Sequence, residues 1–227
     1  MSTSNAIRPL TSKPESLTEI VFETLQEAII NQGLAPGQRV SEASLAQQLN
    51  VSKTPVREAL MRLRNVGLVE SVDGGLRVVN PSARNIRNAY DFRAGLERTA
   101  ASLAGERASA DDTENLVKIA NESLSRAREG DADGFRASDR EFHESIAVAA
   151  RNEILERAIR DSLILTSALR ERDVPASGKS VICAEEHLRI AESLRSGDGE
   201  SAARELWDHV HHVKLIVLSG ISDQDQA

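Results

Sequence analysis

Apolar side chains recur every three or four residues along the start of the chain, the spacing of one helix face. A capping box, Ser16-x-x-Glu19, precedes the first apolar stripe, and the turn Pro36-Gly37 follows it. Ser41 and Ser52 stand at the starts of two further stripes, as helix-capping residues do. The three stripes consist of Leu17, Ile20, Val21, Leu25, Ala28 and Ile29; of Leu45, Ala46 and Leu49; and of Val56, Leu60 and Leu63.

Two short apolar runs, at 68–72 and 76–79, follow the third stripe. Asp73-Gly74-Gly75 between them is a hairpin signal, because glycine adopts the positive φ that a tight turn requires. Three helices followed by a β-hairpin predict a winged helix-turn-helix. We place this domain at residues 16–80, after a flexible polar tail at 1–15.

The pattern changes after Asn80-Pro81-Ser82, and five of the six prolines lie at or before this point. Because helix interiors exclude proline, the rest of the chain is predicted to form long helices. Asp111-x-x-Glu114 is predicted to cap the second of them. Short connections favour an antiparallel six-helix bundle over residues 81–222. The predicted helices cover 82–107, 111–129, 132–150, 153–172, 179–195 and 200–219.

Composition supports a mainly α fold, since aromatic residues make up only 3% of the chain. The single cysteine, Cys183, excludes a disulfide framework and a cysteine-rich zinc module. No apolar stretch approaches the ~20 residues that cross a bilayer, and the polar start of the chain has no secretory apolar region. We therefore expect a cytoplasmic protein with no membrane partner.

The third predicted helix is basic: it has four cations against one acid between Lys53 and Arg64. In a helix-turn-helix this helix enters the major groove of double-stranded DNA. Arg57 has the side chain to pair with guanine, whereas the residues at the helix start are suited to bind phosphate. A solvated basic face is the alternative interpretation. The predicted DNA-binding residues are Ser52, Lys53, Thr54, Arg57 and, at the tip of the wing, Gly74 and Gly75.

All five histidines lie in the predicted bundle, and residues 81–227 carry the whole net charge of −7. Asp139 and His143 are four residues apart and therefore project from one helix face. With His187 and His209 they form a donor set suited to zinc, nickel, cobalt or manganese. The alternatives are an ordinary ion pair and isolated core or surface histidines, because spacing alone does not show that the four converge. His212, three residues after His209, is predicted to lie at the surface, and the alternative is that it faces the cavity.

Three segments of the first domain resemble the GntR family of bacterial transcription regulators. They are Gly33-x-Leu-x-Pro-Gly-x-x-Val40, Val51-Ser-Lys-Thr-Pro-Val-Arg-Glu-Ala-Leu60 and Gly67-Leu68-Val69. The resemblance implies DNA binding, with Ser52, Lys53, Thr54 and Arg57 at the contact positions. One departure is Ala43, where relatives often have Arg or Lys, so the operator sequence is not transferred.

The second domain is similar to FCD, the helical ligand domain of the FadR subfamily. The resemblance rests on Asp139-Arg-Glu-Phe142-His143, Glu186-His187-x-x-Ile190 and His209-Val210. It implies that Asp139, His143, His187 and His209 form a metal site, as in many members. Six helices place the chain near the VanR-like branch. Arg151 is a departure, since relatives usually have glycine there.

The resemblance also implies a small organic acid whose carboxylate binds at the metal. Arg93 is our candidate for neutralising the effector, and the alternative is an ion pair with Glu97 four residues later. We therefore expect a homodimeric, ligand-responsive repressor that reads a palindromic operator. A regulator that responds to the metal alone is the second hypothesis. A metal-dependent enzyme is disfavoured because no acidic residue stands at a recognisable catalytic spacing, so no catalytic residue is assigned.

Overall fold

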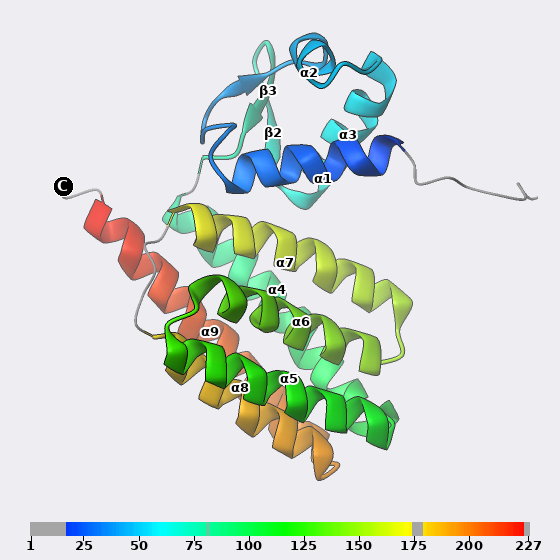
Figure 1. Cartoon of the computed structure of the whole chain (residues 1–227), viewed down its shortest axis with the longest axis vertical. Coiled ribbons are helices and arrows are strands. Elements are labelled where there is room, and N and C mark those ends of the chain that lie inside the picture. Colours follow the sequence, from blue (N-terminus) through cyan, green and yellow to red (C-terminus); the bar gives the residue numbers. More distant parts are fainter. Residues whose placement is uncertain (1–16, 81, 174–178, 225–227) are drawn as a thin grey trace, which may run out of the picture. The chain divides into compact units, whose positions relative to one another are not determined.

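The computed structural model describes residues 17–80, 82–173 and 179–224 (Figure 1). The chain divides into two compact units, Met1–Val79 and Asn80–Ala227. The predicted tail at 1–15 and Ser16 of the predicted capping box lie outside the described residues. Within the described part, no helix combines the length and the apolar character that crossing a membrane requires.

The first unit is a three-helix domain with a small antiparallel sheet, as predicted for a winged helix-turn-helix. The strand order is β1-β3-β2, so the hairpin strand β3 lies in the middle. The short strand β1 was not predicted, because two residues are too few to show an alternating pattern; Val40 of β1 pairs with Leu76. The elements are α1 (Leu17–Ile30), β1 (Arg39–Val40), α2 (Glu42–Leu49), α3 (Lys53–Val66), β2 (Val69–Val72) and β3 (Gly75–Val78).

The turn between α2 and α3 has the caps that the sequence indicates, with one difference. The Ser41 hydroxyl accepts a hydrogen bond from the backbone of Ser44, and Asn50 closes α2 in the left-handed conformation. Ser52 occupies the N-cap of α3, but its side chain makes no capping hydrogen bond. The first apolar stripe is narrower than predicted, since Ile20 is 48% exposed.

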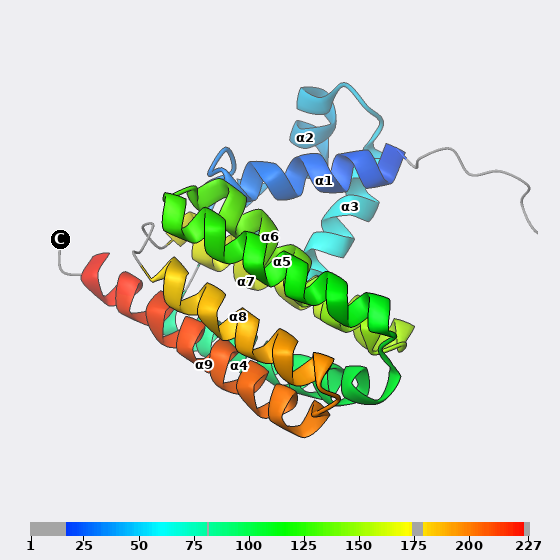
Figure 2. The same ribbon diagram turned by 60° about the horizontal axis from the view of Figure 1, so that its bottom comes forward.

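The second unit is a bundle of six helices in the described residues (Figures 1 and 2). Helix α4 packs against α6, α7 and α9, while α5 packs against α6 and α8. The cap of α5 lies earlier than predicted: Ser109 and Asp112 form the capping box, in place of Asp111 and Glu114. The helices are α4 (Ala83–Arg107), α5 (Ala110–Glu129), α6 (Ala132–Ala149), α7 (Glu153–Asp173), α8 (Ser180–Arg195) and α9 (Gly199–Gln224).

The connection between α6 and α7 shows why glycine is the residue expected at position 151, where this chain has arginine. This residue has a φ of 50°, a left-handed conformation that glycine adopts without strain and arginine does not. Its guanidinium forms an ion pair with Asp112 of α5, which ties the strained residue to a neighbouring helix. Asn152 then caps the start of α7 by accepting a hydrogen bond from the backbone of Leu155.

The bundle interior consists of two apolar clusters with a polar layer between them. On α4, for example, Ala94 belongs to one cluster and Ala100 to the other, with Glu97 between them. Ser123 has the same position on α5, between Ala120 and Leu124. Every helix of the bundle contributes to this layer. Its buried polar residues are Arg93, Glu97, Ser123, His143, Thr166, His187 and His209.

One glycine pair sets how closely α4 and α9 approach each other. A Cβ on Gly105 would lie 2.3 Å from the Cα of Gly199, closer than real side chains come. The backbone of Gly199 cannot move away as a flexible side chain would. These two glycines therefore allow the C-terminal end of α4 to pack closely against the start of α9.

We predict that Gly105→Ala lowers the free energy of unfolding by about 1–3 kcal/mol, because overpacking forces the two backbones apart. Gly95→Ala is the matched control: the site is exposed on the same helix, and nothing lies within 4 Å of the added Cβ. That variant should be neutral or more stable by up to about 1 kcal/mol. Denaturant unfolding followed by circular dichroism measures both. Equal stabilities of the two variants would contradict this account of the contact.

Candidate metal centre and nucleic-acid interface

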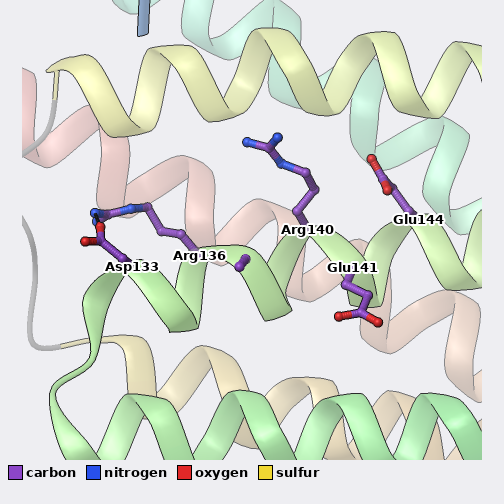
Figure 3. Close-up of a pocket in the computed structure, with 6 residues that line it drawn as sticks. Asp133, Arg136, Arg140, Glu141 and Glu144 are labelled. Atoms are coloured by element: carbon purple, nitrogen blue, oxygen red, sulfur yellow. Dashed lines mark hydrogen bonds and ion pairs between the residues drawn. The ribbon is translucent and has the colours of Figure 1, made fainter. Parts of the chain in front are cut away.

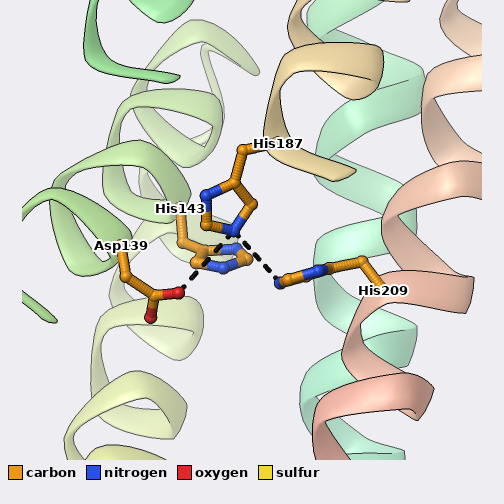
Figure 4. Close-up of side chains that lie close together, drawn as sticks. All are labelled: Asp139, His143, His187 and His209. Atoms are coloured by element: carbon orange, nitrogen blue, oxygen red, sulfur yellow. Dashed lines mark hydrogen bonds and ion pairs between the residues drawn. The ribbon is translucent and has the colours of Figure 1, made fainter. Parts of the chain in front are cut away.

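Asp139, His143, His187 and His209 converge inside the bundle (Figure 4). One ligand atom of each lies within 4.8 Å of the other three. Asp139 and His143 project from one face of α6, while His187 comes from α8 and His209 from α9. The three imidazoles are at most 1% exposed. The convergence that spacing could not establish is therefore present in the fold.

The donor atoms are close together and incompletely satisfied. The Nε2 atom of His187 lies 3.2 Å from Nε2 of His209 and 3.6 Å from Oδ1 of Asp139. Three buried polar atoms of the site have no hydrogen-bond partner: Oδ1 of Asp139, Nε2 of His143 and Nδ1 of His187. Because unpaired buried polar groups are costly, this arrangement indicates a binding site.

Two glutamates fix the orientation of two of the rings. The Nδ1 atom of His143 donates to Glu97 at 2.6 Å, and Nδ1 of His209 donates to Glu186 at 2.7 Å. A carboxylate only accepts, so the proton of each ring lies on Nδ1 and the lone pair of Nε2 faces the site. Glu186 is next to His187 in the sequence, yet its role depends on α9 and was not predicted.

Burial favours the neutral form of two imidazoles of the site, His187 and His209. It lowers the pKa of His187 well below the usual value, and the nearby ring of His209 lowers it further. Burial also lowers the pKa of His209, although Glu186 opposes this. A neutral imidazole is the form that binds a metal ion.

Arg93 forms the ion pair with Glu97 that was considered as an alternative. Its Nε lies 2.5 Å from Oε1 of Glu97, and its Nη1 donates to the Thr166 hydroxyl at 3.2 Å. Burial alone would raise the pKa of Glu97, but the charge of Arg93 and the hydrogen bond from His143 lower it to about 2. Arg93 thus anchors the carboxylate that orients His143, and its role toward an effector stays a prediction.

A second arginine, which the sequence analysis missed, faces the site. Nη1 of Arg170 on α7 lies 3.6 Å from Oδ2 of Asp139, and its side chain is 19% exposed. Burial alone would raise the pKa of Asp139, yet Arg170 and His143 hold it well below its usual range. No local motif marks Arg170, because α7 and α6 meet only in the folded bundle.

The other two histidines lie outside the four-residue cluster. His211 is partly exposed and contacts the backbone oxygen of Trp207 through Nδ1 at 2.9 Å. His212 was predicted to lie at the surface, but it is only 31% exposed, and its Nδ1 donates to Glu186 at 2.9 Å. Glu186 therefore contacts both His209 and His212.

The outer face of α6 carries a groove of about 390 Å³ that contains none of the four converging residues (Figure 3). Its charges are mixed, and Arg136 forms an ion pair with Asp133 at one end. This groove adds nothing to the candidate metal centre. It is lined by Asp133, Arg136, Ala137, Arg140, Glu141 and Glu144.

The predicted DNA-binding residues gather at the start of α3 and at the wing. Ser52, Lys53 and Thr54 are exposed in the first turn, where backbone N–H groups attract phosphate. Arg57 is also exposed, but it forms a two-pronged ion pair with Glu42 of α2 at 2.8–3.0 Å. That partner was not predicted, because it lies 15 residues away.

The wing tip has the backbone that its glycines predict. Gly74 and Gly75 have φ angles of 86° and 141°, which residues other than glycine rarely adopt. The hairpin is exposed at both positions, so its backbone is accessible to a nucleic acid. Nearby, Arg77 pairs with Glu70 on the adjacent strand and fixes the base of the wing.

Two family models match the chain, one for each unit. "Bacterial regulatory proteins, gntR family" matches residues 17–78, and "FCD domain" matches residues 88–212. The chain belongs to the GntR family. It is a DNA-binding transcription regulator with an FCD domain, and the FadR subfamily to which it was likened fits that domain. The predicted fold class and family are thereby confirmed.

Curated relatives have the same role. The regulator is 34% identical over 187 residues to a "Probable D-xylose utilization operon transcriptional repressor" of Paenarthrobacter nicotinovorans, covering 80% of each chain. It is 31% identical to the "HTH-type transcriptional repressor NanR" of Cronobacter sakazakii, covering 91% of this chain and 86% of that one. The family and these relatives are regulators and not enzymes, as predicted.

Solved structures share the fold. E. coli McbR/YncC matches with a TM-score of 0.75 at 23% identity, covering 91% of this chain and 99% of that one. The "Metal-free FCD domain of TM0439 a putative transcriptional regulator" matches with a TM-score of 0.52 at 21% identity, over 63% of this chain and 98% of that one. At these identities the matches establish the fold alone.

Proposed function

We propose that this regulator is a homodimeric repressor whose bundle binds a divalent transition metal and a small anionic effector. The observation that carries the proposal is the convergence of three imidazoles and one carboxylate within 4.8 Å in the interior. An effector that binds one arrangement of the two DNA-binding domains better than another would shift their populations. Since its target is DNA, the proposal places the regulator in the bacterial cytoplasm.

The donor set favours a borderline ion. Three nitrogens and one oxygen suit zinc, nickel, cobalt or manganese, whereas magnesium and calcium prefer oxygen ligands. In a tetrahedral site with bonds of about 2.0–2.1 Å, neighbouring donors lie about 3.3–3.4 Å apart. The separations of 3.2 and 3.6 Å around Nε2 of His187 are close to this spacing. Such an ion, when bound, would act as a Lewis acid toward an oxygen of the effector by expanding its coordination beyond the four protein ligands.

Charge favours an anionic effector. The buried charges pair as Arg93 with Glu97 and Arg170 with Asp139, and Glu186 adds one further carboxylate beside His209, so a divalent cation exceeds the available negative charge. A divalent cation that shares Asp139 leaves positive charge in the interior, and buried unpaired charge is costly. A carboxylate at the site offsets it. We assign its second contact to Arg170, because Arg93 already bonds Glu97 and Thr166.

For the DNA-binding unit, the proposal gives each predicted residue a role. Arg57 reads a base edge, while Lys53, Thr54 and the Ser52 hydroxyl, which makes no cap bond, hold phosphates. The wing glycines bring backbone close to the duplex. Two copies of this unit in a dimer read the two halves of a palindromic operator.

We predict that Arg57→Ala weakens specific operator binding by about 1–3 kcal/mol and relaxes sequence preference, because a base contact is lost. Arg64→Ala is the matched control, since it removes the same charge from the other end of α3. Fluorescence anisotropy with the operator and with single-base variants measures both effects. Unchanged sequence preference in the Arg57 variant would remove this residue from the base-reading set.

We predict that His143→Ala loses the metal equivalent that the wild type binds at the four-residue site, because one of the four ligands is missing. His211→Ala should retain it, since that histidine lies on α9 outside the cluster. Elemental analysis after loading with zinc or nickel and gel filtration gives the stoichiometry. Full occupancy in the His143 variant would refute the ligand assignment.

We predict that zinc-loaded protein binds dicarboxylates more tightly than their half-amides, and that Arg170→Gln reduces dicarboxylate affinity by about 1.5–3 kcal/mol. Arg136→Gln is the control, because Arg136 pairs with Asp133 on the outer face of α6. Isothermal titration measures the affinities, and operator binding measures the response. If metal alone changes operator affinity and no carboxylate binds, the ion itself is the signal.

A further inference from the structure

A second group of metal-binding side chains lies beside the four-residue site. Cys183, Glu186 and His212 each offer one ligand atom, and these atoms lie within 4.8 Å of one another. None of the three belongs to the first group. Cys183 is a free thiol with no exposure, so its sulfur is held in place by the surrounding core.

The fold brings the three together through two helix faces. Cys183 and Glu186 are three residues apart on α8, so they project from the same side. His212 is three residues after His209 on α9, which packs against α8. Its Nδ1 lies 2.9 and 3.1 Å from the two oxygens of Glu186.

The donor types identify the class of ligand. A thiolate is a soft donor and an imidazole is a borderline one, so the set favours zinc and its soft neighbours over magnesium or calcium. We propose that Cys183, Glu186 and His212 form a second site for a thiophilic divalent cation such as Zn²⁺. Bonds of about 2.0–2.3 Å require donors about 3.3–3.8 Å apart. Glu186 and His212 are already as close as this, at 2.9–3.1 Å, and the sulfur of Cys183, within 4.8 Å of both, needs to approach by at most about 1 Å.

Solvent can reach the three side chains, and the buried thiol limits the affinity of the site. Glu186 and His212 are 16% and 31% exposed, so water can reach the cluster and complete the coordination. Binding replaces the S–H bond of Cys183 with a sulfur–metal bond and releases one proton to solvent. When Nδ1 of His212 binds the cation, the proton that it donates to Glu186 moves to Nε2 of the same ring, so the imidazole stays neutral. Burial raises the pKa of this thiol to about 12, so the site binds more weakly than one of neutral imidazoles at the same pH.

Glu186 links the two sites. Its Oε2 accepts the hydrogen bond from Nδ1 of His209 at 2.7 Å, and the same carboxylate contacts His212. A cation on Glu186 therefore changes the acceptor that orients a ligand of the first site. The proposal does not depend on occupation of the first site, because no ligand is shared.

The test uses full-length protein freed of metal and titrated with Co²⁺, whose thiolate complexes absorb strongly in the near ultraviolet. The wild type should bind a weaker, second equivalent that produces this absorption. Cys183→Ala and His212→Ala should both lose the absorption and one equivalent. His143→Ala should lose the tighter equivalent and keep the thiolate absorption. Excess Zn²⁺ should displace the cobalt.

His211→Ala is the matched control and should behave as the wild type. Circular dichroism of every variant establishes that it is folded, and Cys183→Ser provides a second removal of the thiol if the alanine variant unfolds. Absence of thiolate absorption in the wild type would overturn the second site. So would an absorption that survives His212→Ala. Loss of the first equivalent alone, in the His143 variant, would leave the second site standing and separates the two proposals.

Discussion

The bundle depends on the neutralisation of charge in its interior. Arg93, Glu97 and His143 form one chain of contacts, and Arg170 and Asp139 form another, between two apolar clusters. Burying an ion pair gains little by itself, but removing one partner leaves a charge that the interior cannot solvate. The pairing therefore fixes which faces of α4, α6 and α7 meet, and the apolar clusters supply the stability.

The same layer explains why the candidate metal centre lies here. All six helices contribute a buried polar residue to it, and three polar atoms around Asp139, His143 and His187 lack hydrogen-bond partners. A ligand bound by Asp139, His143, His187 and His209 would touch three helices at once. Small shifts of packed helices are discrete because interiors are close-packed, so such a site suits a two-state response.

The sequence predicted the structural features that depend on residues close together in the chain. Helical periodicity located the six bundle helices, and the spacing of four placed Asp139 and His143 on one face. Glu186, Arg170 and the partner of Arg57 act across elements that only the fold brings together, so no spacing rule reveals them. The sequence analysis also missed the exposure of Ile20 and the two-residue strand β1, because the packing of neighbouring elements determines both.

The contact between Arg57 and Glu42 has a consequence for target search. The guanidinium already has a carboxylate to bond, so a base must offer a better partner than the one it displaces. A guanine presents two acceptors with matching geometry, whereas most other base edges do not. In the proposed base-reading role, an incorrect sequence would leave Arg57 paired with Glu42. Discrimination would then arise from competition between Glu42 and the base edge as well as from attraction to the operator.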